Sequence, residues 1–277
     1  MATPFLKWAG GKSKHLPVID GILDDAGIKR VGAYCEPFIG GGAVFFALQA
    51  SGSFERAIIG DANVELVRCY QGVRADPEGV VAGLMRFASP WNERNYQMVR
   101  AEHEEHLELS AARTIYLNKA GFNGLYRVNK NGCFNVPWGK HKKAPAWSAL
   151  DFDECSDALN DHVKIVCGDF EKTLTLLPKG KRSLAYLDPP YVPVSKTSNF
   201  TGYTAGGFSM GEQERVAEAF DELAKRKNVA LLSQADVPWV RERFRNYDFV
   251  EVQARRNINS KGDKRGPVGE VIVCANL

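Results

Sequence analysis

Hydrophobic positions in the first sixty residues alternate between the spacing of a strand and that of a helix. An apolar strand ends at Val31–Phe38, a glycine turn follows at Gly40–Gly42, a helix begins at Ala43–Ala50, and a second strand covers Ala57–Gly60. This order opens a parallel α/β sheet, whose crossover connection is right-handed. The sequence therefore predicts a sheet of parallel strands connected by helices.

The same alternation returns in the second half of the chain. Amphipathic spacing predicts helices near Glu212–Lys227 and Pro238–Asn246. Short apolar runs predict strands at Val163–Cys167, Leu184–Leu187, Val229–Ser233, Phe249–Gln253 and Glu270–Cys274.

The periodicity changes between the two halves. Residues 75–120 have helical spacing, and Gly124–Val136 predicts a hairpin around Asn131-Gly132, a favoured two-residue turn. We therefore expect one discontinuous sheet domain with an inserted helical and hairpin module. The sheet domain comprises residues 1–74 and 161–277, and the module comprises residues 75–160.

Composition is that of a folded globular protein, because 44% of the 277 residues are hydrophobic and 25% are charged. The net charge of +3 identifies no partner, but its distribution does. Residues 109–150 contain no Asp or Glu, where chance would place 33/277 × 42, or about five. Seven bases give this segment a charge of +7, which favours a polyanion because cationic side chains release counterions from phosphates. They are Arg113, Lys119, Arg127, Lys130, Lys140, Lys142 and Lys143.

Other classes of protein are disfavoured. The six cysteines form no CxxC pair, which is typical of reduced thiols in a cytosolic protein and indicates neither a disulfide framework nor a zinc site. No apolar run approaches the ~20 residues that span a bilayer, and the N-terminus lacks the pattern of a signal peptide. We expect a cytoplasmic protein with no membrane partner and no metal.

The glycine turn predicts a small-molecule site. Gly40 and Gly42 allow a ligand to approach the backbone where a strand becomes a helix. A dinucleotide fingerprint needs another glycine at position 45, which is Phe45, so a pyrophosphate is disfavoured. Asp61 follows the next strand, where an acid accepts hydrogen bonds from ribose hydroxyls. The pair predicts a nucleoside site, and the alternative is a tight turn with a helix cap.

The segment Gly11-Lys12-Ser13 invites comparison with a phosphate-binding loop. That motif needs a glycine five residues before Gly11, where Leu6 stands. By itself the segment favours an ordinary loop, with Trp8 packed and Lys12 solvated.

The strongest chemical signal is the tetrapeptide Asp188-Pro189-Pro190-Tyr191, which directly follows an apolar strand. Two prolines end strand pairing and force a rigid turn at the carboxyl edge of the sheet, where ligands of open α/β folds bind. The Asp188 carboxylate and the Pro189 carbonyl can accept both hydrogens of an exocyclic amine, and Tyr191 offers a ring for stacking. The alternative is a plain turn with a capping Asp.

Together these segments resemble the Dam family of DNA adenine-N6 methyltransferases, the D12 class of the S-adenosylmethionine-dependent enzymes. The resemblance extends over nearly the whole chain and implies a Rossmann-like sheet with helices on both faces and an inserted target-recognition domain. The segments that carry it are Phe5–Lys12, Glu36–Gly42, Asp61, Gly121–Arg127, Phe134–Lys140 and Asp188–Tyr191.

The resemblance also implies a set of site residues, and it reverses the interpretation of Trp8 and Lys12. The catalytic residues are Asp188, Pro189, Pro190 and Tyr191. S-adenosylmethionine, which leaves as S-adenosylhomocysteine, is expected to contact Trp8, Ala9, Gly10, Lys12, Glu36, Phe38, Gly40, Gly42, Asp61, Asp169, Phe170 and Asp188.

The implied macromolecular partner is double-stranded DNA, bound by a monomer that flips the target adenine, with GATC as the usual family target. Arg127 is the candidate for guanine, Leu125 and Pro137 for a thymine methyl, and Lys7 for a further base. The Phe122 ring is expected to fill the gap left by the flipped base. The full DNA-binding set is Lys7, Phe122, Asn123, Leu125, Arg127, Asn135, Pro137, Trp138 and Lys140.

A second basic strip, from Arg255 to Arg265, is expected to contact phosphates. The resemblance places the protein in the cytoplasm of a bacterial or phage-infected cell. Two other functions stay open at this point: methylation of adenine in structured RNA, and regulation by a DNA-binding protein that has lost catalysis.

Overall fold

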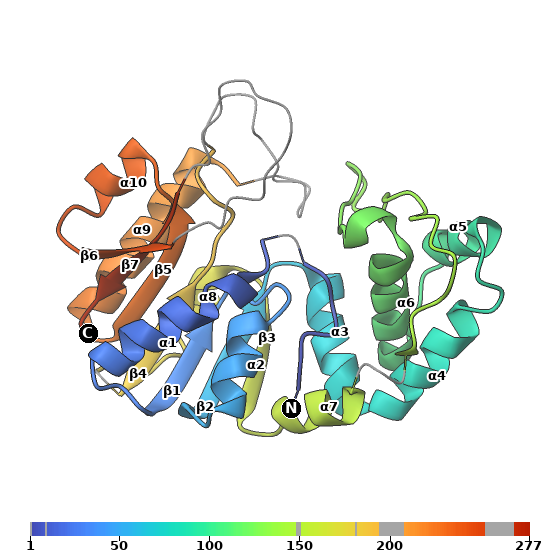
Figure 1. The fold of residues 1–277 in the computed structure, drawn as a ribbon, viewed down its shortest axis with the longest axis horizontal. Coiled ribbons are helices and arrows are strands. Elements are labelled where there is room, and N and C mark those ends of the chain that lie inside the picture. The colour runs from blue at the N-terminus through green and yellow to red at the C-terminus, as the bar shows by residue number, and fades with distance from the viewer. Residues whose placement is uncertain (1, 9, 148–150, 181, 194–207, 253–268) are drawn as a thin grey trace.

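One central sheet organises the molecule (Figure 1). In the computed structural model, the described residues form seven strands in the order β3-β2-β1-β4-β5-β7-β6. Their bounds are β1 Val31–Glu36, β2 Phe54–Asp61, β3 Val163–Cys167, β4 Ser183–Leu187, β5 Val229–Ala235, β6 Asp248–Val252 and β7 Glu270–Ala275. The described residues are 2–8, 10–147, 151–180, 182–193, 208–252 and 269–277.

Strand direction changes at one side of the sheet. The strands β3, β2, β1, β4 and β5 are parallel, whereas β7 is antiparallel to both β5 and β6. The chain passes from β1 to β2 on one side and from β4 to β5 on the other side. Ligands of such folds bind in the crevice beyond the carboxyl ends of two neighbouring strands whose connections diverge in this way. The predicted parallel α/β sheet is confirmed, and each predicted strand overlaps an observed one.

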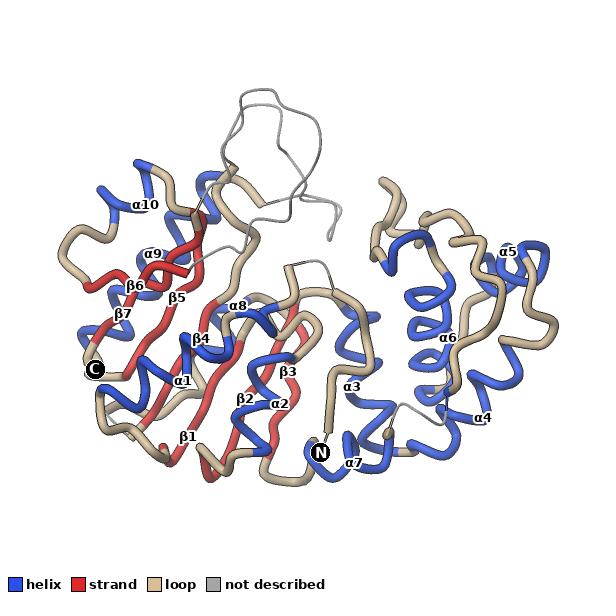
Figure 2. Tube along the Cα trace, viewed as in Figure 1, coloured by secondary structure: helices blue, strands red, loops and turns tan. Residues whose placement is uncertain are grey.

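Helices cover both faces of the sheet, as Figure 2 shows. Alternate strand residues face opposite ways, so Tyr34 joins one hydrophobic core and its neighbours Ala33 and Cys35 join the other. The first face carries α1 Leu16–Asp25, α2 Ala43–Ala50, α3 Val64–Ala75 and α7 Phe152–Ala158. The second carries α8 Phe170–Leu174, α9 Met210–Lys225 and α10 Pro238–Arg243.

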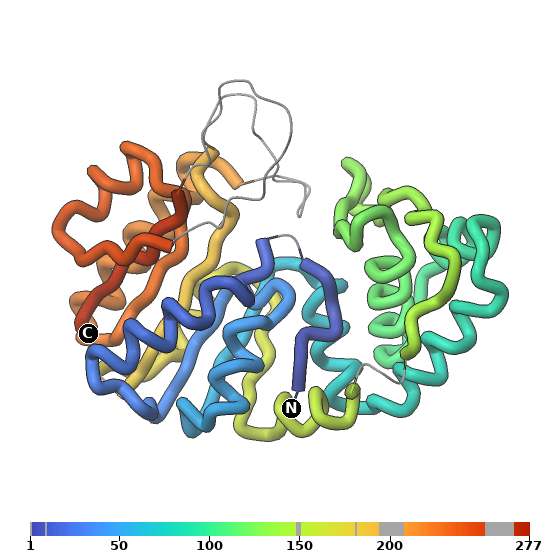
Figure 3. Tube along the Cα trace, viewed as in Figure 1, coloured from blue at the N-terminus to red at the C-terminus, as the bar shows by residue number. Residues whose placement is uncertain are grey.

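The segment between α3 and α7 forms a helical unit beside the sheet, coloured cyan to green in Figure 3. Asp76 starts it by accepting a hydrogen bond from the Gly79 N–H at 2.8 Å, with Pro77 in the first turn of the helix. The unit packs on the sheet domain through contacts between α6 and α3, and the two share one core. Its elements are α4 Pro77–Phe87, α5 Glu93–Ala101, α6 Leu107–Ala120 and the short 3₁₀ turn η2 Phe122–Gly124.

Arg113, one of the seven bases of the acid-free segment, is buried inside this unit. Its guanidinium donates to the carbonyls of Val99 at 2.9 Å and Arg100 at 2.7 Å, which belong to the last turn of α5. A cation at a helix C-terminus satisfies carbonyls that lack helical partners. Arg113 therefore stabilises the unit and takes no part in its surface charge.

The predicted hairpin differs from the observed one. A bridge pairs Val128 with Phe134, and the Asn129 N–H donates to the Cys133 carbonyl, which leaves a three-residue loop. Gly132 has φ 77°, as the left-handed position of such a loop requires. The prediction of a two-residue turn at Asn131-Gly132 is therefore wrong. The physical reason is that the Asn129 carboxamide accepts from the N–H groups of residues 131 and 133 and closes the longer loop.

The N-terminal segment runs past α7 and lies between the sheet domain and the inserted unit (Figure 3). The fully buried Asn118 of α6 fastens it. The Asn118 carboxamide accepts from the Lys7 N–H at 2.9 Å and donates to the Lys7 carbonyl at 2.7 Å and to the Gly124 carbonyl at 2.9 Å. One side chain thus joins this segment to the loop after α6.

Candidate active site

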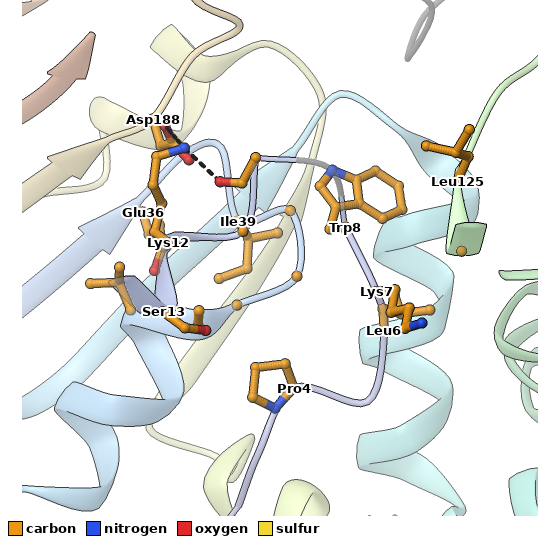
Figure 4. Close-up of a pocket in the computed structure, with 18 of the residues that line it drawn as sticks. Pro4, Leu6, Lys7, Trp8, Lys12, Ser13, Glu36, Ile39, Leu125 and Asp188 are labelled. Atoms are coloured by element: carbon orange, nitrogen blue, oxygen red, sulfur yellow. Dashed lines mark hydrogen bonds and ion pairs between the residues drawn. The ribbon is translucent and has the colours of Figure 1, made fainter. Parts of the chain in front are cut away.

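The carboxyl ends of β1 and β4 bring two acids together. Glu36 is the last residue of β1, and Asp188 directly follows β4, its parallel neighbour. The ammonium of Lys12 lies 2.9 Å from Asp188 Oδ1 and donates to the Gly10 carbonyl at 2.6 Å (Figure 4). An acid pair with a buried cation thus occupies the edge where the fold predicts a ligand.

A pocket of about 400 Å³ opens beside these three side chains. Figure 4 shows Asp188, Lys12 and Glu36 on one side of it and Trp8 and Leu125 on the other. Residues predicted for the cofactor and for DNA line this one pocket, whereas Ala9 is outside the described residues. The predicted residues that line it are Lys7, Trp8, Gly10, Lys12, Glu36, Gly40, Gly42, Asn123, Leu125 and Asp188.

Burial controls the charges at this site. Glu36 is 3% exposed, and burial raises its pKa well above the usual range, although the Tyr34 hydroxyl donates to its Oε2 at 2.7 Å. Burial also raises the pKa of Asp188, while the nearby Lys12 ammonium opposes this increase. Lys12 itself is 7% exposed. The site therefore offers one buried cation and two acids whose protonation a charged ligand would change.

The glycine turn has the close packing that its residues predict. Gly40 and Gly42 have φ of 49° and 75°, values that favour glycine. A Cβ at Gly40 would lie 2.9 Å from the Trp8 ring, and one at Gly42 would lie 2.6 Å from the Tyr70 hydroxyl. The Trp8 ring also stacks on Tyr126, with centroids 5.1 Å apart. Trp8 thus lies between the glycine turn and the inserted unit.

Asp61 ties the end of β2 to the glycine turn. Its two carboxylate oxygens accept from the Gly40 N–H at 3.3 Å and from the Asn63 N–H at 2.9 Å. Burial raises its pKa to about 6, and these backbone donors oppose the shift. The N-cap of α3 is Asn63, so Asp61 is not the helix cap of the alternative interpretation. Its carboxylate instead holds the glycine turn through the Gly40 N–H.

Three of the residues predicted to contact the cofactor, Phe38, Asp169 and Phe170, lie together but outside the pocket lining. The Phe170 ring stacks on Phe38 with centroids 5.2 Å apart. Arg215 of α9 lies 5.0 Å from the Phe170 ring and donates to both carboxylate oxygens of Asp169 at 3.0 Å. The sequence did not indicate Arg215, because no local pattern joins a residue of α9 to the end of β3.

The Asp188–Tyr191 turn is held by side chains that sequence reasoning missed. The Tyr191 hydroxyl donates to Glu270 Oε2 at 2.9 Å, and His15 Nε2 lies 2.9 Å from the same oxygen. The ammonium of Lys12 lies 4.7 Å from the centroid of the Tyr191 ring. No pattern in the sequence marked Glu270 as a partner of Tyr191.

Two glutamines hold the backbone of the same turn. The Gln213 carboxamide donates to the Pro190 carbonyl at 2.6 Å, and Gln234 accepts from the Val192 N–H at 3.1 Å. Gln234 also donates to Gln213 at 3.0 Å. Because both glutamines are buried, these bonds fix the turn from α9 and β5.

The predicted DNA-binding residues divide into exposed and buried groups. Phe122 is 49% exposed, and Arg127 is exposed while its guanidinium donates to Asn135 Oδ1 at 2.7 Å. Pro137 and Lys140 are also exposed. Trp138 is buried against Trp91 and Tyr96, so its ring belongs to the core.

Some predictions fall on parts of the chain without a description. The strip from Arg255 to Arg265 lies outside the described residues. Within the described residues, no group of three or more His, Cys, Asp or Glu side chains is arranged to hold a metal ion. No helix among them has both the length and the apolar character needed to cross a membrane.

Comparison with known proteins gives a consistent result. The family model described as "D12 class N6 adenine-specific DNA methyltransferase" matches residues 8–258. The "Type II methyltransferase M.MjaIII" of Methanocaldococcus jannaschii is 38% identical in an alignment that covers 95% of this chain and 94% of that protein. The "Type II methyltransferase M1.LlaDCHI" of Lactococcus lactis is 35% identical, with coverage of 98% and 94%. The "DNA adenine methylase" of Escherichia coli is 32% identical, with coverage of 97% and 93%.

Proposed function

This chain belongs to the D12 class of N6 adenine-specific DNA methyltransferases, and we propose that it flips an adenine out of duplex DNA and methylates it within GATC. Membership makes it a site-specific adenine DNA methyltransferase and implies the use of S-adenosylmethionine. The flipping, the target sequence and the residue roles below are the proposal.

The observation that carries the proposal is the shared pocket. Asp188 and Lys12 on the sheet side line the same pocket as Asn123 and Leu125 of the inserted unit. A base that left a duplex bound by the inserted unit would therefore come close to Asp188. We propose the same division as the sequence predicts, with a sheet domain of residues 1–74 and 161–277 and a target-recognition domain of residues 75–160, and the shared pocket supports it.

The chemistry of the side chains fits S-adenosylmethionine, which carries an ammonium, a carboxylate and ribose hydroxyls. Glu36 and Asp188 offer acidic oxygens, Lys12 offers a cation, and Asp61 offers an acceptor for hydroxyls. The cofactor supplies an electrophilic methyl group on a sulfonium. The residues proposed to hold it are Trp8, Gly10, Lys12, Glu36, Phe38, Gly40, Gly42, Asp61, Asp169, Phe170 and Asp188, together with Ala9, which is outside the described residues.

Asp188 and Pro189 prepare the adenine amine for attack. The N6 lone pair is delocalised into the ring, and two acceptors that bind both N–H groups favour a tetrahedral nitrogen with a localised lone pair. Orientation and electrostatic stabilisation of this kind need no covalent intermediate. Lys12 fixes the Asp188 carboxylate by their 2.9 Å contact. Asp188 would act as an orienting acceptor while a new N–C bond to the methyl group replaces the S–C bond of the sulfonium, and the proton that N6 releases would pass to solvent. Tyr191 stacks on the base.

The inserted unit supplies the sequence readout. Arg127 is exposed beside Asn135 and is proposed to bind guanine through two hydrogen bonds. Leu125 and Pro137 contact a thymine methyl, and Lys7 makes a further base contact. The exposed Phe122 ring replaces the flipped adenine in the stack, which offsets part of the few kcal/mol that flipping costs. Asn123 and Lys140 complete the surface, while the buried Trp138 supports it.

One experiment tests the proposed reaction and its rivals. The purified protein and S-adenosylmethionine are incubated with a GATC duplex, a duplex with a permuted site, and a paired RNA of the same sequence. We expect methyl groups on N6 of adenine in the GATC duplex alone, and a rise in 2-aminopurine fluorescence when that base replaces the target adenine. Methylation confined to RNA would contradict the proposal. Absence of S-adenosylmethionine binding by calorimetry would support a catalytically inactive DNA-binding regulator instead.

A further inference from the structure

One turn of the chain contacts the Tyr191 ring directly and reaches the Tyr191 hydroxyl through Glu270. The 3₁₀ turn η1, Lys12–Lys14, leads directly into His15, the residue before α1. From this turn Lys12 places its ammonium 4.7 Å from the centroid of the Tyr191 ring. His15 Nε2 lies 2.9 Å from Glu270 Oε2, the oxygen that accepts the Tyr191 hydroxyl at 2.9 Å. The ring and the hydroxyl are thus restrained by neighbouring residues.

The two members of the His15–Glu270 pair are held independently of Tyr191. The His15 N–H donates to the Lys12 carbonyl at 2.8 Å, and the imidazole is 4% exposed. Glu270 begins β7 and is in register with Ala235 of β5. The hydrogen bond from His15 is the main cause that lowers the pKa of Glu270 to about 2, so Glu270 is a carboxylate at neutral pH. Tyr191 therefore donates to a charged acceptor whose position is fixed.

We propose that Glu270, held by His15, is a positioning residue that sets the plane of the Tyr191 ring for stacking on the flipped adenine. This inference rests on the proposed function. A tyrosine ring has a broad torsional well about its second side-chain bond. A hydrogen bond at the hydroxyl and a cation near the ring face restrict that torsion, so the ring is already oriented when the base arrives.

The surroundings allow this role to be separated from general support of the turn. The backbone of residues 190–192 is held by Gln213 and Gln234, whose hydrogen bonds with the Pro190 carbonyl and the Val192 N–H do not involve the Glu270 side chain. Removal of the Glu270 carboxylate therefore leaves these backbone bonds in place and frees the Tyr191 side chain. The loss of one hydrogen bond to a charged group corresponds to about tenfold or more in rate when that bond acts in the transition state.

The test is a double-mutant cycle between Glu270→Ala and Tyr191→Phe, with kcat and KM measured for the GATC duplex and for S-adenosylmethionine. We expect each single variant to lower kcat about tenfold with KM changed by less than about twofold, and the double variant to be no worse than either. Glu270→Gln keeps an acceptor for both partners and should retain kcat within about threefold of wild type. Glu251→Ala, which removes an exposed acid from the adjacent strand, is the matched control and should leave kcat unchanged.

Multiplicative losses of about 100-fold in the double variant would overturn the inference, since Glu270 would then act independently of the Tyr191 hydroxyl. An unchanged kcat in Tyr191→Phe would overturn it too, as would a loss of more than about threefold in Glu270→Gln. These two variants keep the inference falsifiable even if Glu270→Ala fails to fold. A wild-type protein that does not methylate adenine in GATC would refute the proposed function separately, because the cycle is measured only on an active enzyme.

Discussion

Replacement of Asn118 by leucine tests how the N-terminal segment is attached to the inserted unit. The Asn118 carboxamide makes three hydrogen bonds, two with the Lys7 backbone and one with the Gly124 carbonyl. Leucine has a similar size but can make none of them. The substitution therefore removes the polar contacts without opening a cavity.

The expected cost follows from the number of bonds. A typical buried hydrogen bond contributes about 0.5–1.5 kcal/mol, and unpaired buried groups cost more. Three bonds then give a loss of about 2–4 kcal/mol in the free energy of unfolding. Since domains are stable by only about 5–15 kcal/mol, this is a large fraction of the total. The loss should also loosen Lys7 and the neighbouring wall of the pocket.

Urea denaturation of both proteins, followed by circular dichroism, measures the change, and calorimetry with S-adenosylhomocysteine measures the effect on the pocket. Asn95→Leu is the control for the number of bonds lost, because the Asn95 carboxamide makes one main hydrogen bond, a donation to the Phe87 carbonyl at 2.6 Å. It should lose about 1 kcal/mol. A loss of less than about 1 kcal/mol in Asn118→Leu would falsify the reasoning that the three bonds hold the segment in place.

Three further changes address the chemistry. Asp188→Ala should abolish methyl transfer in a radiolabel assay and leave DNA affinity, measured by fluorescence anisotropy, largely intact; retained turnover would rule out its role as acceptor. Arg127→Ala should relax the preference for one base of the target by about 1–3 kcal/mol in competition assays, whereas an equal loss on all sequences would mean that it contacts only phosphate. The pKa of Asp61 is about 6, so its carboxylate is mostly ionised above pH 6, and affinity for S-adenosylhomocysteine should fall about fivefold between pH 6 and pH 5. Because burial raises this pKa, protonation of Asp61 below pH 6 favours the folded state, so lost binding there does not report unfolding; an equal pH dependence in Asp61→Asn would contradict the assignment.

The sequence predicted those parts of the molecule that depend on local patterns. The apolar runs marked each strand, and the two prolines after Leu187 placed Asp188 at the edge of the sheet. Parallel pairing of β1 with β4 then accounts for the meeting of Glu36 and Asp188. These features depend on periodicity and on backbone restrictions, which are properties of short segments.

Contacts between distant segments could not be predicted in the same way. His15 and Glu270 meet because β7 lies between β5 and β6, an order that no periodicity encodes. Likewise, Arg215 reaches Asp169 only because α9 packs beside α8. At the hairpin, the carboxamide of Asn129 determines the loop length, and the preference of the following Asn-Gly pair for a two-residue turn is overridden.

The placement of β7 has a consequence for synthesis on the ribosome. In the described sheet β6 pairs with β7 alone, although residues 248–252 are translated before residues 270–275. At a translation rate of about 5–20 residues per second, more than about ten seconds pass between the synthesis of Lys12 and that of Glu270. A nascent chain can therefore form the glycine turn and the inserted unit early, yet it has no anchor for Tyr191 until β7 emerges. The full turnover rate would then be reached only after β7 has been translated, because Glu270 is proposed to orient Tyr191 for the base.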